Sequence, residues 1–279
     1  MKVREIIHEL TVPPRIEILE VLRNKYLNLS LIYNELKNKE LDVSLSTLSR
    51  HVRTLHKLGL IKKVGRKYTM SGTGMLLYDL IHQLDDICLW DEICESAEFI
   101  SSIPNELRLG LSKLKSAEIE RDIYTAVFKV FKAAENAKSW GKYIDRIIHL
   151  DIFKVMIQKN LDGVTKKVIS SRDTVDRKVS MILSVIEDLK LDEDEMEVVK
   201  SKCEIRILDL PIQLGVVDGG IAFFQILKVY RCVPAYVAPV YISTDEECVK
   251  WANNLFEHFW QKAERFDLAK HIDSINPNK

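Results

Sequence analysis

The chain has 279 residues, of which 47% are hydrophobic and 29% charged, a composition that allows two folded domains and excludes disordered or collagen-like classes. Its net charge is zero, but residues 1–70 carry fourteen Lys/Arg against seven Asp/Glu (+7), and the remainder carries twenty-seven against thirty-four (−7). A basic N-terminal module followed by an acidic body is typical of a nucleic-acid-binding protein with a separate ligand or partner domain.

Targeting and cysteine patterns both favour a cytoplasmic protein. Residues 1–10 are charged and lack the apolar segment of a secretory signal, and no stretch approaches the ~20 apolar residues that cross a bilayer, so no membrane partner is expected. The five cysteines (88, 94, 203, 232 and 248) form no C-x-x-C pair. Cys88 and Cys94 would lie about 120° apart on a helix. Buried free thiols are therefore favoured over a disulfide or metal site, with a redox switch as the alternative.

Three short helices are expected in the first forty residues. Residues 2–10 can form a lead-in helix, and Pro13-Pro14 opens a second helix that runs to about Arg23. Ser30 can cap a third helix that ends near Lys39. Its buried residues would be Leu31, Ile32 and Leu36.

The segment from Ser44 to Ser71 contains seven basic side chains and no Asp or Glu. Apolar residues recur in its first half at spacings of three and four, which predicts an amphipathic helix over residues 45–58. Ser44 can cap this helix, and Gly59 can supply the left-handed residue that ends it. Residues 60–70 then predict two short strands joined by a tight turn with Gly65 at its centre. The apolar stripe of the helix consists of Leu45, Leu48, Val52, Leu55 and Leu58.

A polar and basic helix followed by a basic hairpin is typical of the recognition helix and wing of a winged helix-turn-helix. Such a helix fits the major groove, and Arg50 is the best candidate for base reading because a guanidinium matches the paired acceptors of guanine. Basic residues on the wing would contact the phosphate backbone. His51 and His56 are expected to pack or to contact phosphate rather than to bind a ligand. The candidate DNA-binding residues are Ser46, Thr47, Ser49, Arg50, Arg53, Lys57, Lys62, Lys63, Arg66 and Lys67.

Three segments are therefore expected: a winged helix over 1–72, a helical linker over 73–102 and an α/β domain over 103–279. Apolar residues at helical spacing predict a helix over 75–100 within the linker. This helix either joins two subunits or packs on its own body. The C-terminal domain is expected to mix helices with strands, so that the whole chain is α+β.

Within the C-terminal domain, helices are predicted over residues 116–138, 150–160 and 174–189, with a solvated helix start at 192–197. Gly163 separates a helix from a strand, so that strand, helix and strand form a parallel β-α-β unit. Thr244 and Glu247 can form a capping box for a last helix that ends near Phe266. Strands are predicted over residues 143–149, 164–170, 204–210, 212–217, 220–227 and 235–242. The last helix would bury Val249, Ala252, Leu255, Phe256, Phe259 and Trp260, and residues 276–279 would be frayed.

Several of these runs resemble known families. The run S-T-L-S-R-H-V-R-T-L-H-K-L-G-L-I at 46–61 resembles ArsR/MarR-type winged helices. The runs I-P-N-E-L-R-L-G-L-S-K-L at 103–114, D-G-G-I-A-F-F-Q-I at 218–226 and W-A-N-N-L-F-E-H-F-W-Q-K-A at 251–263 resemble archaeal winged-helix regulators with a "methanogenesis regulatory protein" middle domain. The resemblance implies a homodimeric cytoplasmic transcription regulator whose C-terminal α/β domain, residues 103–279, serves in sensing and dimerisation. Its C-terminal domain is also similar to the sensor domain of TrmB-type sugar regulators and, more distantly, to the phospholipase D fold.

The phospholipase D likeness raises a catalytic hypothesis that the residues do not favour. That chemistry needs H-x-K-x-x-x-x-D, and no His in the chain is followed two residues later by Lys. The sequence also contains no Walker, G-x-S-x-G or H-E-x-x-H motif, so no enzyme activity, catalytic residue or cofactor is predicted. His82, Cys88 and Cys94 would be scattered around a helix, and no metal site is predicted.

Two functions remain. The first is a dimeric, sequence-specific regulator that binds double-stranded DNA and responds to an unknown small-molecule effector. The alternative is a winged-helix adaptor that holds proteins together in a transcription or RNA-processing assembly. An acidic or apolar recognition face would have favoured this alternative, and the sequence predicts neither. A pocket near the strands at 204–242, with Tyr230, Arg231 or Tyr236 at its mouth, could take the effector, although packing explains these residues equally well.

Overall fold

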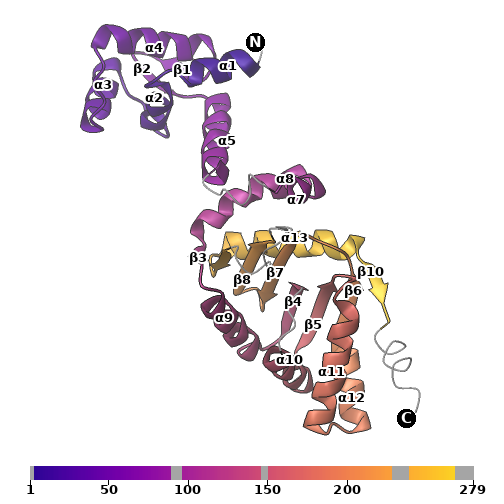
Figure 1. Cartoon of the computed structure of the whole chain (residues 1–279). Coiled ribbons are helices and arrows are strands. Elements are labelled where there is room, and N and C mark those ends of the chain that lie inside the picture. The colour runs from indigo at the N-terminus through magenta and orange to yellow at the C-terminus, as the bar shows by residue number, and fades with distance from the viewer. Residues whose placement is uncertain (1–2, 89–95, 146–149, 228–238, 268–279) are drawn as a thin grey trace. The chain divides into compact units, whose positions relative to one another are not determined.

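A computed structural model describes residues 3–88, 96–145, 150–227 and 239–267 (Figure 1). The chain divides into two compact units, unit 1 (residues 1–86) and unit 2 (residues 87–279). This division falls inside the segment 73–102 that was expected to be a linker. The linker is therefore shared between two cores: Tyr78 is buried in unit 1 and Phe99 in unit 2.

Unit 1 has the helix and strand order of a winged helix. Strands β1 and β2 pair antiparallel, and Leu27 adds a bridge to Tyr68 with backbone hydrogen bonds of 2.7 and 3.0 Å. Ile18, Leu22 and Leu55 are among the fully buried residues around which the helices pack. The elements of unit 1 are α1 (Val3–Leu10), α2 (Arg15–Leu22), α3 (Leu29–Asn38), α4 (Leu45–Lys57), β1 (Ile61–Val64), β2 (Lys67–Met70) and the start of α5 (Gly72–Cys88).

The start of α3 differs from the prediction. Asn28 caps this helix, because its side chain accepts a hydrogen bond from the backbone N–H of Leu31 at 3.0 Å, and Ser30 lies inside the first turn. The helix consequently turns Leu31 outward, where 44% of it is exposed, while Ile32 and Leu36 are fully buried as expected. Two neighbouring residues able to cap a helix made this boundary ambiguous in the sequence.

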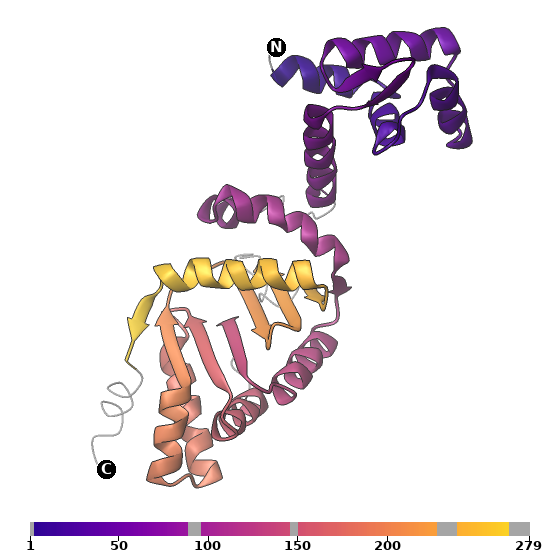
Figure 2. The ribbon, with the colours of Figure 1, turned by 180° about the vertical axis from the view of Figure 1, so that it is seen from behind.

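Unit 2 is a mixed sheet of eight strands in the order β10-β6-β5-β4-β7-β8-β9-β3. Strands β4, β5 and β6 are parallel, as the β-α-β pattern predicted, and every other pairing is antiparallel. Helix α13 covers one face of the sheet, and α9 to α12 lie on the other (Figures 1 and 2). The strands are β3 (Glu118–Glu120), β4 (Trp140–Asp145), β5 (Thr165–Ser170), β6 (Cys203–Ile207), β7 (Ile212–Val217), β8 (Ile221–Ile226), β9 (Val240–Ser243) and β10 (Glu264–Phe266).

The described helices of unit 2 pack on both faces of the sheet and form a separate hydrophobic core on each face. Trp251 and Phe256 of α13 are buried against the strands on one face, and Val179 and Val185 of α11 are buried on the other. The expected stripe of α13 is buried throughout, which confirms it. The helices are α7 (Ala97–Ser102), α8 (Asn105–Leu109), the 3-10 helix η1 (Gly110–Ser116), α9 (Ile123–Glu135), α10 (Leu150–Leu161), α11 (Val175–Leu189), α12 (Glu193–Lys202) and α13 (Glu246–Lys262).

Three local predictions for unit 2 were wrong. The expected helix 116–138 begins only at Ile123, because residues 118–120 pair with β9 as an edge strand. The last helix ends at Lys262, and residues 264–266 pair with β6. Its N-cap is Asp245 rather than Thr244, with the Asp245 side chain accepting from the N–H of Cys248 at 3.0 Å. The two edge strands form because they pair with strands distant in the sequence, and local periodicity does not reveal such pairing.

Some predictions fall outside the described residues. These are the middle of the helix expected over 75–100, the end of the strand expected over 143–149, the start of the strand expected over 235–242 and the tail at 276–279. Cys94, Cys232, Tyr230, Arg231 and Tyr236 lie there as well.

Candidate functional site

Hydroxyl groups cluster at the start of the recognition helix α4. The Ser44 side chain accepts the backbone N–H of Thr47 at 3.2 Å, which confirms it as the N-cap. Its hydroxyl also lies 2.9 Å from the Ser46 hydroxyl and donates to the Thr47 hydroxyl at 2.9 Å. The first turn of α4 therefore presents hydroxyls and free helical N–H groups together, an arrangement that suits a phosphate oxygen.

The basic side chains predicted to bind DNA are exposed and unpaired. Arg50, Arg53 and Lys57 of α4 and the four basic residues of the wing are all exposed. Among the described residues none of these seven side chains forms an ion pair with a carboxylate. Four other basic residues of unit 1 do form ion pairs, and these are Arg15 with Glu9, Arg23 with Asp79, Lys25 with Glu35 and Lys39 with Glu20. The described residues therefore place seven unpaired cations on the helix and wing, where an external polyanion can reach them.

The wing turns at Gly65. Val64 pairs with Lys67, which leaves Gly65 and Arg66 as the two turn residues, and Gly65 has a positive φ of 61°. This is the conformation that a two-residue hairpin with glycine at its first position requires. Lys62 and Lys63 lie on β1, and the Lys63 ammonium lies 5.9 Å from the centre of the Tyr68 ring. The predicted wing is therefore present, with its basic residues on both sides of the turn.

A buried polar network links α4 to helices α1 and α2. The Arg15 guanidinium donates to Nδ1 of His51 at 3.1 Å and to the backbone oxygen of Glu9 at 2.7 Å, and it also pairs with the Glu9 carboxylate. Burial, together with the positive charges of Arg15 and Arg50, lowers the pKa of His51, so its ring is neutral at pH 7 and can accept this bond. The network joins α1, α2 and α4. His51 is therefore a packing residue, whereas His56 is exposed.

Leu45 is a surface residue that the sequence reasoning placed in the core. It is the first residue of α4, and 49% of it is exposed, whereas Leu48, Val52 and Leu55 are buried as predicted. Leu45 stands at the very start of α4, where its side chain does not reach the core of unit 1.

Removing the cap of α4 is expected to destabilise unit 1 modestly. Ser44→Ala should lower its free energy of unfolding by about 1 kcal/mol, because the Thr47 N–H loses its partner. Ser30→Ala is the matched control, since Ser30 does not cap α3 and alanine favours helix interiors. Thermal unfolding followed by circular dichroism measures both. Equal losses in the two variants would show that Ser44 has no special role.

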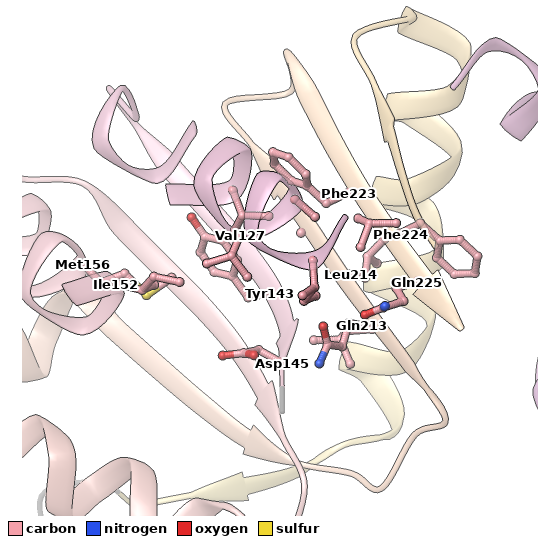
Figure 3. A pocket seen from close by; sticks show the side chains of 16 residues that line it. Val127, Tyr143, Asp145, Ile152, Met156, Gln213, Leu214, Phe223, Phe224 and Gln225 are labelled. Atoms are coloured by element: carbon pink, nitrogen blue, oxygen red, sulfur yellow. The ribbon is translucent and has the colours of Figure 1, made fainter. Parts of the chain in front are cut away.

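Unit 2 contains a pocket between the sheet and helices α9 and α10 (Figure 3). Tyr143, Gly215 and Phe223 lie side by side on β4, β7 and β8, and the missing side chain at Gly215 leaves room between the two rings. A methyl group at Gly215 would meet Phe223 and Tyr143 at 3.4 and 3.5 Å, so alanine would fill this space without a clash. Gln213, paired with Gln225, adds amide groups to the otherwise mainly apolar lining.

The described residues also bear on the metal and membrane predictions. In these parts of the chain no three His, Cys, Asp or Glu side chains gather as a metal site would require, and no helix is long and apolar enough to span a bilayer. Among the described thiols, Cys203 and Cys248 are unbridged. Burial raises the pKa of both thiols, which keeps them protonated.

Comparisons with known proteins bear on unit 1 first. Residues 10–73 match the Ferric uptake regulator family (FUR). Among curated proteins, none matches the chain. The matched residues contain α2 to β2, and the match supports the interpretation of unit 1 as the DNA-binding part of a regulator. The ArsR/MarR subtype stays a prediction.

Solved structures with similar folds include one of TrmBL2, described as an archaeal chromatin protein with a novel mode of DNA binding. It is 18% identical and covers 94% of this chain and 99% of its own, with a TM-score of 0.42. The others are the phospholipase D family member Nuc from Salmonella typhimurium (14% identity, 54% of this chain, 97% of its own, TM-score 0.38) and NucT from Helicobacter pylori (15%, 54%, 98%, TM-score 0.39).

Proposed function

We infer that this protein is a sequence-specific DNA-binding transcription regulator. The observation that carries the proposal is the set of seven exposed basic side chains, unpaired among the described residues, on α4 and the wing. Buried anchors on α4 position this helix firmly enough to present a fixed face to a groove. The match of residues 10–73 to a regulator family supports the same conclusion.

In the proposed complex, α4 enters the major groove and the wing lies along the backbone. Arg50 would read a guanine, and Ser46, Thr47 and Ser49 would contact bases or phosphates near the start of the helix. Lys62, Lys63, Arg66 and Lys67 would neutralise phosphates without reading sequence, and Arg53 and Lys57 would extend this contact along α4.

Binding to a labelled duplex from the protein's own upstream region tests this proposal. Fluorescence anisotropy should show tight binding that random DNA does not compete away, with log K falling steeply against log salt. No binding to any duplex at any salt concentration would favour the adaptor alternative. An unspecific but strongly salt-dependent interaction would point to a DNA-coating role and would overturn the claim of sequence specificity.

The wing residues are expected to affect affinity and salt dependence but not sequence preference. Each of Lys62→Ala and Lys67→Ala should reduce the slope of log K against log salt by about 0.9, the value for one phosphate contact on B-DNA. Lys37→Ala on α3, which removes an equal charge from another surface of unit 1, should leave the slope unchanged. A changed base preference in a wing variant would contradict the assignment.

Homodimerisation through α5 is the second part of the proposal. Leu76, Leu80 and Leu84 recur every four residues and are 69%, 39% and 53% exposed, while Leu77, Tyr78 and Ile81 pack on the core of unit 1. A second copy of α5 would bury this stripe, and two-fold symmetry would place two half-sites about one helical turn apart. Sedimentation of Leu76→Glu should show a monomer. A dimer that survives this change would place the interface elsewhere.

For unit 2 we propose effector sensing without catalysis. The pocket between the sheet, α9 and α10 is a concave, mainly apolar site with few polar groups, which is the usual character of small-molecule sites. Binding of an effector there would be expected to change affinity for DNA by linkage between the two sites.

A further inference from the structure

A second cavity of unit 2 lies deeper, between strands β4 to β6 and helices α10 to α12. Its volume is about 50 Å³, which is room for about three to five water molecules. Its walls are mainly apolar and include Phe153, Ile182 and Val199. Lys166, Val168 and Ser170 alternate along β5 and turn their side chains into it, whereas Ile169 faces the opposite core. A lysine and a serine thus stand on the inward face of a central strand.

Two polar atoms in this cavity have no hydrogen-bond partner among the described residues. Lys166 donates to Oδ1 of Asn160, which fixes the orientation of that amide and leaves its Nδ2 donor unpartnered. The Ser170 hydroxyl is likewise unpartnered. Asn160 and Ser170 are 2% and 0% exposed, so bulk water does not satisfy them. Buried donors without partners are uncommon in native proteins and call for a ligand or bound water.

The cavity also contains one amine, that of Lys166, whose protonated form has no counter-charge among the described residues. Lys178 is neutralised, because its ammonium hydrogen-bonds to the backbone oxygen of Asp145 and lies 3.5 Å from the Asp145 carboxylate. Lys166 is only 5% exposed, and among the described residues its ammonium donates to the amide oxygen of Asn160. The Cys203 thiol beside it is kept neutral, since burial raises its pKa, and the Tyr143 phenol is kept neutral for the same reason. Among the described residues, no anionic group therefore lies beside the Lys166 amine to balance its charge.

We propose that this cavity binds a small aliphatic monocarboxylate whose carboxylate lies between Lys166 and Asn160. One anionic charge matches the one unbalanced ammonium, and the carboxylate oxygens accept from Nζ of Lys166 and Nδ2 of Asn160. The apolar walls suit a short alkyl chain and disfavour a divalent anion such as sulfate. The volume limits the ligand to about the size of acetate to butyrate. Ser170 lies four residues further along β5, where a bound water would satisfy it.

Binding should be coupled to proton uptake. Burial lowers the pKa of Lys166 to about 7, so at pH 8 this amine is mostly neutral in the free protein. A carboxylate beside it would favour the ammonium form. Up to one proton per chain would then be taken up on binding, and calorimetric heats should vary with the ionisation enthalpy of the buffer.

The test is titration of the full chain, without DNA, with sodium acetate, propionate and butyrate at constant ionic strength. We expect a saturable heat with one site per chain, a rise in Tm, and proton uptake at pH 8. Sodium chloride, and propionamide, which lacks the negative charge, should produce no saturable heat, no rise in Tm and no proton uptake. Equal effects from either control, or no saturable binding by any carboxylate, would overturn the proposal and leave the cavity to water.

Variants locate the site. Lys166→Met should weaken binding at least about tenfold, because a hydrogen bond to a charged group is lost. Asn160→Asp supplies an internal carboxylate next to Lys166 and should abolish binding while raising Tm. Lys167→Met, on the same strand with its ammonium 5.3 Å from the Trp260 ring, is the matched control and should bind normally. Unchanged affinity in Lys166→Met or in Asn160→Asp would overturn the assignment. Because no DNA is present, these outcomes are independent of whether unit 1 binds DNA.

Discussion

Unit 2 is expected to gain stability between pH 7 and 9.5, and replacing Lys166 with Met is expected to remove most of that gain. The pKa of Lys166 is about 7 in the folded protein and about 10.5 in the unfolded chain, so the unfolded state binds more protons throughout this window. Stability consequently rises with pH, by roughly 3 kcal/mol from this residue over these 2.5 pH units. Below pH 7 the contribution levels off, because the amine is protonated in both states.

Chemical denaturation at several pH values measures this effect. Unfolding of unit 2 can be followed through Trp251 and Trp260, which lie on α13 and are buried against the sheet. The Lys167→Met control, on the opposite face of β5, should keep the full pH dependence. A Lys166→Met protein with the same pH dependence as the parent would show that this amine is not desolvated in the folded state. An added monocarboxylate should flatten the dependence in the parent protein alone.

Replacing Arg50 with Ala is expected to weaken binding to the specific duplex by about 1–3 kcal/mol and to relax the preference at one base position. Arg50 is exposed on α4, and the adjacent His51 anchors the helix, so the loss should come from the interface and not from folding. Anisotropy titrations against duplexes substituted at each position measure both quantities.

Arg50→Lys separates the two ways in which Arg50 could act. A lysine keeps the charge but cannot form the bidentate pair of a guanidinium with guanine. If Arg50 reads a base, Arg50→Lys should lose nearly as much specificity as Arg50→Ala. If affinity for specific and random duplexes falls equally in Arg50→Ala, and Arg50→Lys restores both, then Arg50 is a phosphate contact.

The sequence was most informative where a residue acts on its own chain neighbours. Ser44 caps α4, Gly65 turns the wing, and the parallel unit around Gly163 forms as predicted, because each of these depends on local backbone conformation or periodicity. The exposed basic face of α4 could be predicted for the same reason. The N-caps of α3 and α13 are Asn28 and Asp245, which resemble the expected caps in chemistry and lie within two positions of them.

Features that depend on distant partners could not be predicted. Arg15 and His51 are 36 residues apart, and nothing in either neighbourhood indicates their hydrogen bond. The run Thr165–Ser170 indicates a strand but does not disclose which face is covered, so Lys166 looks like an ordinary surface lysine. Only the packing of α10, α11 and α12 over this strand turns it into a buried amine.

The two faces of α4 are under different constraints. Leu48, His51, Val52 and Leu55 hold the helix to unit 1, while Ser46, Arg50, Arg53 and Lys57 are exposed and contribute little to that hold. In the proposed complex with DNA, substitutions on the exposed face would therefore alter the preferred operator with almost no loss of folding stability. Duplicated copies of such a gene could diverge to control different promoters through changes at these few positions, with the scaffold beneath them unchanged.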